Sequence, residues 1–411
     1  MTRKPPGFWL SAIALLAASA AHAQSAPALK LNDRGYYEAR GVNVLVFNNW
    51  YDSLFSDSKI SGVELIQRDV RTATNGDVRL SPTPGQWDPI GKLIERKVDP
   101  ATGVIEATLE YAEYGFRYVI RAEPRGEGVV LSINLDKPLP AALEGKAGCN
   151  LEFLPSAYFR KTYMVDGKPA LFPLYPSSDM APAAGPEGRA EPLPLASGRQ
   201  IVLAPEDGAR RVRVEAGAGR VSLYDGRDQA QNGWYVLRGE IPAGRTGRVL
   251  EWTVTAQADA GWVRPPMIAH SQLGYAPDQK KVAVLELDRN DGARPPARLL
   301  RLTDKGDYVP ALEGAVKPWG KYLRYDYATF DFSAVKTPGA YVIAYGSARS
   351  APFRIDPAVY ADAWFPTLDV YFPVAMDHMF VNEAYRVWHG DSHRDDALQA
   401  PINHEHLDLY A

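Results

Sequence analysis

The sequence predicts a mainly β protein in which two consecutive β domains are followed by a helical segment. From residue 35 to 255, short runs of β-branched and aromatic residues are separated by Gly, Pro, Asp and Asn, a pattern typical of strands joined by turns. Residues 265–356 show the same pattern of short apolar runs separated by turn-forming residues. From Pro357 onward, apolar residues recur at intervals of three to five, which is typical of helices.

The first 23 residues are expected to be a secretory signal peptide that does not belong to the fold. Arg3 and Lys4 precede an apolar run from Phe8 to Ala21, and an Ala-His-Ala sequence ends at Ala23. A charged start, a short apolar run and a small-residue end form such a signal, and the run is too short to span a bilayer. We therefore expect a secreted or periplasmic protein with no membrane insertion.

Composition narrows the choice of partners. The net charge is −3, and acidic and basic residues are mixed along the chain, so there is no basic stripe for nucleic acid.

The single cysteine, Cys149, cannot form an internal disulfide. Stability must therefore come from burial of the hydrophobic residues, which make up 46% of the chain. The sequence leaves the oligomeric state open.

The first β domain is expected over residues 24–258, as a large sandwich without helices of ordinary length. Within it, Val104–Tyr111 and Phe116–Ala122 alternate apolar and polar residues on either side of a short connection, which predicts a hairpin. The sequence ATNGD at Ala73–Asp77 is expected to be a turn. Pro173–Leu195 is rich in Pro, Ala, Gly and Ser, which predicts a long surface excursion.

A second β domain is expected over residues 265–356, after a linker that contains Pro265 and Pro266. Several short strands within this length are typical of an immunoglobulin-like sandwich. The predicted strands are Lys281–Leu287, Ala297–Leu302, Tyr325–Asp331, Ala340–Tyr345 and Pro352–Ile355.

The segment 357–411 is expected to be helical. Its apolar residues at helical spacing are Val359, Ala363, Leu368, Tyr371, Ala375 and Met379. Pro366 and Pro373 would begin or kink helices. A segment this short buries too little surface to be stable alone, so we expect it to be the opening part of a third domain, truncated near its start.

Three segments resemble glycoside hydrolase family 9, the cellulase family that carries an immunoglobulin-like domain ahead of its catalytic barrel. Ile268–Leu287 and Pro338–Tyr360 resemble the first and last strands of that domain, and HGDSHRDDA at His389–Ala397 is similar to the HGxCHxxDA segment of the family's barrel. The resemblance implies that the third domain begins an (α/α)6 barrel. It also implies β-1,4-glucan as the polysaccharide substrate, hydrolysis with inversion, a base in an Asp-Ala-Gly-Asp motif and a Glu acid near the carboxyl end.

The catalytic groups that the resemblance implies are not found in this chain, which contains no Asp-Ala-Gly-Asp sequence. An inverting glycosidase needs two carboxyl groups roughly 6.5–9.5 Å apart across the sugar. We therefore expect an enzyme by family but no catalytic residue here, and no activity from these 411 residues alone. The alternative is a non-catalytic carbohydrate-binding or adhesion module.

The histidine-rich end of the chain could serve a metal or a substrate. His389 and His393 are four residues apart, and His404 follows nearby, so imidazoles could converge. Ser392, however, occupies the family's cysteine position, and zinc is not expected without thiolates. The preferred interpretation is that these polar residues line or support the substrate cleft of the barrel. They are His389, His393, Asp395, Asp396 and His404.

Other candidate sites have simpler explanations. Aromatic residues in Asn49–Phe55, Gly85–Ile90 and Gln231–Leu237 could stack on sugar rings, although aromatic residues of a sandwich more often lie in its core. The acidic residues of LDRND at Leu287–Asp291 could favour calcium, but turn formation explains them equally well. No cofactor is therefore expected.

Overall fold

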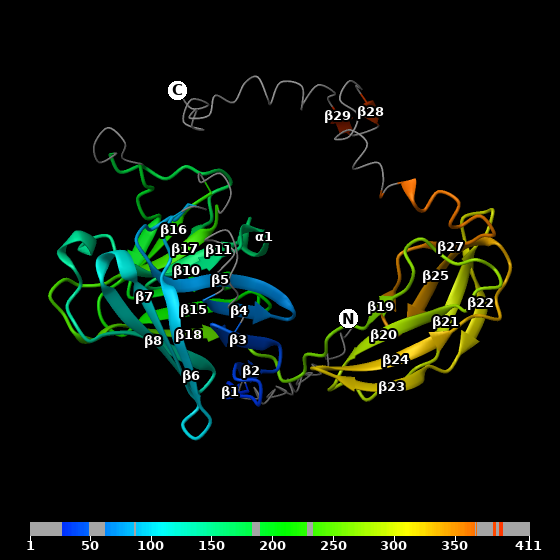
Figure 1. The fold of residues 1–411 in the computed structure, drawn as a ribbon, viewed down its shortest axis with the longest axis horizontal. Coiled ribbons are helices and arrows are strands. Elements are labelled where there is room, and N and C mark those ends of the chain that lie inside the picture. Colours follow the sequence, from blue (N-terminus) through cyan, green and yellow to red (C-terminus); the bar gives the residue numbers. More distant parts are fainter. Residues whose placement is uncertain are drawn as a thin grey trace, which may run out of the picture. The chain divides into compact units, whose positions relative to one another are not determined.

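The computed structural model describes residues 27–48, 62–85, 88–182, 190–227, 233–365, 367, 381–383 and 386–388. The chain divides into two compact units, and the boundary falls between Trp262 and Val263. The predicted mainly β class is confirmed (Figure 1), because the strands form antiparallel sheets and only one short α-helix, α1 (Pro155–Tyr158), is delimited within the described residues. No helix in this described part is long and apolar enough to cross a membrane.

The first unit is built from two nine-stranded antiparallel sheets. The first sheet runs in the order β1 (Lys30–Leu31), β2 (Tyr37–Ala39), β3 (Val42–Val46), β4 (Val63–Gln67), β5 (Val70–Arg79), β10 (Gly148–Phe153), β17 (Tyr235–Glu240), β16 (Val221–Asp225) and β13 (Ala196–Gly198). The second runs in the order β12 (Lys168–Leu171), β11 (Thr162–Val165), β14 (Gln200–Leu203), β15 (Val212–Ala216), β18 (Gly247–Ala256), β9 (Gly128–Leu135), β8 (Phe116–Arg125), β7 (Val104–Tyr111) and β6 (Lys92–Asp99).

One hydrophobic core joins the two sheets of this unit. Val44 and Leu151 of the first sheet belong to the same buried cluster as Ile105, Leu109 and Trp252 of the second. Burial alternates along β7 and β18, as expected for strands that face a core on one side. The first unit is therefore a β-sandwich.

The predicted hairpin in this unit is confirmed, but the predicted turn at Ala73–Asp77 is wrong. β7 and β8 pair in antiparallel register and are connected by the 3-10 turn η2 (Ala112–Tyr114). Ala73–Asp77 instead lies inside β5, where the register with both neighbouring strands shifts. Asn75 adopts a left-handed φ of 52° there. Asparagine tolerates this conformation, so the Asn-Gly signal marks a bulge within a strand.

The second unit also contains two sheets that share one core. Its four-stranded sheet runs β19 (Met267–Ala269), β20 (Val282–Asp288), β24 (Tyr325–Asp331) and β23 (Lys317–Tyr322). Its five-stranded sheet runs β22 (Tyr308–Gly314), β21 (Ala297–Leu302), β25 (Gly339–Tyr345) and β26 (Ala348–Arg349), with β27 (Phe353–Ile355) also paired to β25. Leu285 and Phe330 pack with Leu299 and Ile343 in the core between them. All five predicted strands are present, and the structure adds β19, β22, β23 and β26.

Most of the segment in which helices are expected after Pro357 lies outside the described residues, but Phe365 and Thr367 are described and are helical. Residues 357–364 form turns, and the side chain of Asp356 accepts a hydrogen bond from the Ala358 N–H. Further on, β28 (Val381–Glu383) and β29 (Arg386–Trp388) pair as antiparallel strands. The remaining residues of the expected barrel lie outside the described ranges.

Candidate functional site

The residues predicted to line or support a substrate cleft all lie outside the described part of the chain. They are His389, His393, Asp395, Asp396 and His404. Their role therefore stays a prediction, as does the signal peptide at residues 1–23. Among the described residues, no group of three or more His, Cys, Asp or Glu side chains could hold a metal ion.

The structure describes only some of the other candidate residues from the sequence. Residues 49–55 and Trp87 lie outside the described ranges. Tyr235 is fully buried in the core of the first unit, which agrees with a core role. Asp288 accepts hydrogen bonds from both the main-chain and side-chain nitrogens of Asn290, each at 2.8 Å. This is the geometry of a side-chain-stabilised turn.

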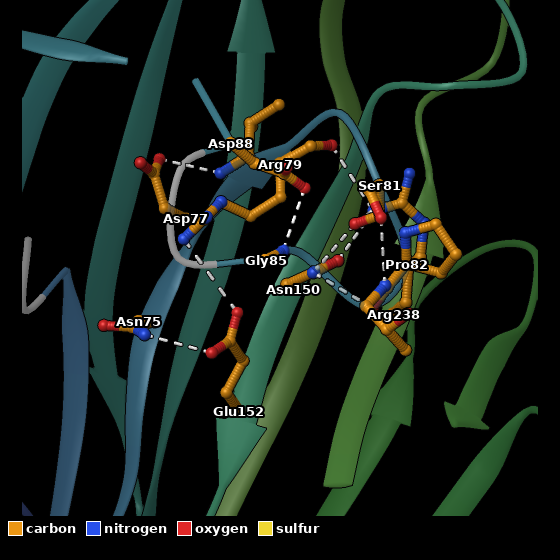
Figure 2. A network of polar contacts seen from close by, with 12 residues as sticks. Asn75, Asp77, Arg79, Ser81, Pro82, Gly85, Asp88, Asn150, Glu152 and Arg238 are labelled. Atoms are coloured by element: carbon orange, nitrogen blue, oxygen red, sulfur yellow. Dashed lines mark hydrogen bonds and ion pairs between the residues drawn. The ribbon is translucent and has the colours of Figure 1, made fainter. Parts of the chain in front are cut away.

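A buried polar cluster in the first unit was missed by the sequence analysis. We use this name for six side chains on β5, β10 and β17, shown in Figure 2: Asn75, Asp77, Arg79, Asn150, Glu152 and Arg238. All six are buried. The strand register explains why they meet, since Asn150 lies opposite Asp77 on one side and opposite Arg238 on the other.

Arg238 and Asn150 hold the loop that follows β5. Arg238 Nη1 donates to Asn150 Oδ1 at 2.7 Å and to the Ser81 carbonyl at 3.0 Å. Asn150 Nδ2 in turn donates to the Ser81 carbonyl at 3.2 Å. From the other side, Glu191 accepts hydrogen bonds from the hydroxyls of Ser81 and Thr83. The cluster thus fixes residues 81–83 and anchors the excursion that contains Glu191.

The two carboxyl groups of the cluster lie in a low-dielectric environment. Asp77 Oδ1 accepts hydrogen bonds from the Tyr118 hydroxyl at 2.8 Å and from the Val78 N–H at 2.7 Å. Its Oδ2 has no hydrogen-bond partner among the described residues, and burial raises the pKa of Asp77 to about 7. Burial also raises the pKa of Glu152, against the opposing effect of Arg79, whose Nη1 lies 4.0 Å from Glu152 Oε1.

A carboxyl group with a pKa near neutrality can serve as an acid or base, but here it has no access to a substrate. Asp77 is fully buried and Glu152 is 2% exposed. The cavity beside Cys149 and Asn150 measures about 10 Å³, room for about one water molecule. The cluster therefore organises the sandwich, and it is not an active site.

An open cleft of about 770 Å³ lies elsewhere on the first unit. Three arginines line it together with acidic and amide side chains. Arg68 forms an ion pair with Asp259 at 3.3 Å, and Arg211 donates to the Pro205 carbonyl. Arg68 and Arg211 are thus engaged with neighbouring groups of the cleft, and the arrangement does not single out one ligand.

The second unit carries exposed aromatic side chains on its four-stranded sheet. We call this feature the aromatic hollow, a depression of about 360 Å³ lined by Val284, Trp319, Tyr322, Tyr327 and Thr329. Trp319 is 66% exposed and Tyr322 is 58% exposed. The register between β23 and β24 shifts at Trp319, between Pro318 and Gly320. This bulge explains how Trp319 and Tyr322, three residues apart, line the same depression.

A polar network supports one wall of the aromatic hollow. The Trp319 and Tyr327 rings meet nearly edge to face, with centroids 6.0 Å apart. The Tyr327 hydroxyl donates to Glu286 at 2.7 Å, and this hydrogen bond raises the pKa of Tyr327 to about 12. Arg264 completes the network, with its Nη2 2.8 Å from Glu286 and its guanidinium over the Tyr325 ring. The Tyr327 ring is thereby held in one orientation.

Comparison with known families is informative for the second unit. Residues 264–350 match the family described as the cellulase N-terminal ig-like domain. The chain contains an immunoglobulin-like domain of the cellulase type. The resemblance seen in the sequence is confirmed for this domain, which includes the whole aromatic hollow.

Solved structures of glycoside hydrolase family 9 proteins are also similar to part of the chain. A metagenome-derived family 9 endoglucanase is 26% identical with a TM-score of 0.25, and the match covers 29% of this chain and 23% of that one. A family 9 protein of Bacteroides ovatus is 27% identical with a TM-score of 0.23, and the match covers 29% of this chain and 20% of that one. The chain thus spans less than a quarter of either protein. No curated protein sequence matches it.

Proposed function

We propose that this chain is the amino-terminal portion of an exported family 9 glycoside hydrolase that cleaves β-1,4-glucan with inversion. The observation that carries the proposal is the match of residues 264–350 to the cellulase immunoglobulin-like domain. Further support comes from HGDSHRDDA at His389–Ala397, which follows that domain in the order that the family resemblance implies. Residues 1–23 would direct export to the periplasm or the medium.

In this proposal the chain supplies accessory domains and part of the cleft, but not the catalytic pair. The sequence has no Asp-Ala-Gly-Asp motif, and inversion needs an acid and a base on opposite sides of a bound sugar. Asp77 and Glu152 are closed to substrate and do not fill these roles. His389, His393, Asp395, Asp396 and His404 would line or support the cleft. The polysaccharide substrate is a β-glucan with a β-1,4 backbone.

Immunocapture from the native producer tests this function. Antibodies against the purified chain would capture the native protein from its producer. Mass spectrometry of peptides from residues 264–350 would identify the captured protein. The captured material is expected to release reducing sugar from carboxymethyl cellulose, mixed-linkage glucan or xyloglucan. Capture blocked by excess purified chain is the matched control. Captured material that contains these peptides but hydrolyses none of the three polymers would contradict the proposal and favour a non-catalytic binding module.

A further inference from the structure

We propose that the aromatic hollow of the immunoglobulin-like domain is a binding surface for a β-1,4-linked glucan chain. The choice of sugar rests on the proposed function, whereas the existence of a sugar-binding surface rests on the geometry of the hollow. Two exposed rings, Trp319 and Tyr322, form its open side, and Tyr327 forms its supported wall.

The spacing of the two exposed rings suits a polymer of sugar units. Trp319 and Tyr322 lie three residues apart on one strand, β23, and three residues of a strand span at most roughly 10 Å. This is comparable to the length of a β-1,4-linked disaccharide. Each pyranose presents an apolar face of axial C–H groups, and the flat ring of Trp or Tyr covers such a face while burying apolar surface. Two stacking positions along one strand would therefore engage alternate units of an extended glucan.

Polar groups beside the rings suit the equatorial hydroxyls of the same sugar. The Tyr327 hydroxyl donates its proton to Glu286, so its oxygen can still accept a hydrogen bond from a ligand. Thr329, two residues further along β24, adds a hydroxyl to the lining of the hollow. The Arg264 contact satisfies Glu286 and holds the Tyr327 ring in place before a ligand binds, which lowers the entropic cost of binding.

The size and edges of the hollow argue against a protein partner. Its lining consists of five residues, whereas stable protein interfaces use about 20–30 residues on each side. The adjacent edge strand β23 carries exposed Lys317 and Lys321. Lysines on an edge strand oppose pairing with a strand of a second copy. A narrow, neutral polymer fits this surface better than another protein does.

Affinity electrophoresis in hydroxyethyl cellulose and calorimetry with cellohexaose test the inference on the full chain. Trp319→Ala is expected to weaken binding by at least about tenfold, because the central aromatic contact of a small site dominates its affinity. Trp319→Phe, which keeps a stacking ring, should recover part of the loss. The matched control is Tyr175→Ala, since Tyr175 is 77% exposed but lies on the first unit. Near-UV circular dichroism would check folding.

Three results would overturn the inference. These are no binding to either glucan, equal binding by Trp319→Ala and Tyr175→Ala, or a dimer in sedimentation that Trp319→Ala dissociates. Its failure is distinguishable from failure of the proposed function. If the captured native product hydrolyses glucan but the hollow does not bind it, only this inference fails. If binding depends on Trp319 but the captured product is inactive, only the hydrolase proposal fails.

Discussion

The stability of the first unit is predicted to fall as pH rises toward neutrality, because of Asp77. Burial raises the pKa of this carboxyl group from 3.8 to about 7. The folded state therefore holds the proton more tightly than the unfolded chain does. The resulting stability is complete below the unfolded pKa and is lost as pH rises through the folded pKa. A difference of about three pKa units corresponds to about 4 kcal/mol across this window.

Two substitutions test whether Asp77, and not another titrating group, causes this pH dependence of stability. Asp77→Asn removes the titration, so it should flatten the pH dependence by up to about 1.4 kcal/mol per pH unit between about pH 4 and pH 7. Tyr118→Phe removes the hydroxyl that hydrogen-bonds to the carboxylate and lowers its pKa. This variant should raise the pKa of Asp77 further and extend the loss of stability to higher pH.

Urea unfolding of the full chain at several values between about pH 5 and pH 8 measures these effects. The transition of the first unit would be identified by near-UV circular dichroism from buried aromatic residues such as Trp252. The reasoning is refuted if the wild type does not lose stability over this range, or if wild type and Asp77→Asn lose it in parallel.

Three further predictions concern stability and activity. Trp252→Ala should destabilise the first unit by about 3–5 kcal/mol in urea unfolding, since the ring is 1% exposed; a cost below about 1 kcal/mol would contradict the core assignment. Gly274→Ala should destabilise the second unit more than Gly306→Ala does, because both glycines have positive φ but only the Cβ at Gly274 would meet the Arg354 carbonyl; equal melting temperatures would argue against this geometry. The purified chain from residue 24 to 411 should release no reducing sugar from soluble β-glucans, because the proposed function assigns the catalytic pair to none of its residues, and turnover abolished by Asp395→Asn or Asp396→Asn would contradict this.

Local patterns predicted those elements whose partners lie nearby in the sequence. The β7–β8 hairpin was predictable because strict alternation flanks a short connection that ends at Gly115, which has a φ of 56°. β23 was not predictable in this way, since all six of its residues are exposed and no apolar alternation marks the strand. Trp319, which contributes most exposed ring surface to the hollow, was missed for this reason.

Local sequence patterns could not predict contacts between residues that are far apart in the sequence. In the buried polar cluster, Asn75 and Glu152 are 77 residues apart, and Asn150 and Arg238 are 88 apart. Only the strand order β5, β10, β17 brings them together. The Asn-Gly pair signalled a left-handed residue correctly, but such a signal does not specify whether the chain reverses or only bulges. Helical spacing after Pro357 did not mark the turns at residues 357–364 or the β28–β29 pair, whereas Phe365 and Thr367 are helical as expected.

The most direct test of the proposed function is the stereochemistry of the first product. The native protein would be captured with antibodies against this chain. Proton NMR would then follow its hydrolysis of a β-1,4-linked oligosaccharide. A family 9 enzyme that inverts the anomeric carbon should release the α-anomer first, before mutarotation. Initial release of the β-anomer, or no hydrolysis by captured material that contains peptides of residues 264–350, would contradict the account.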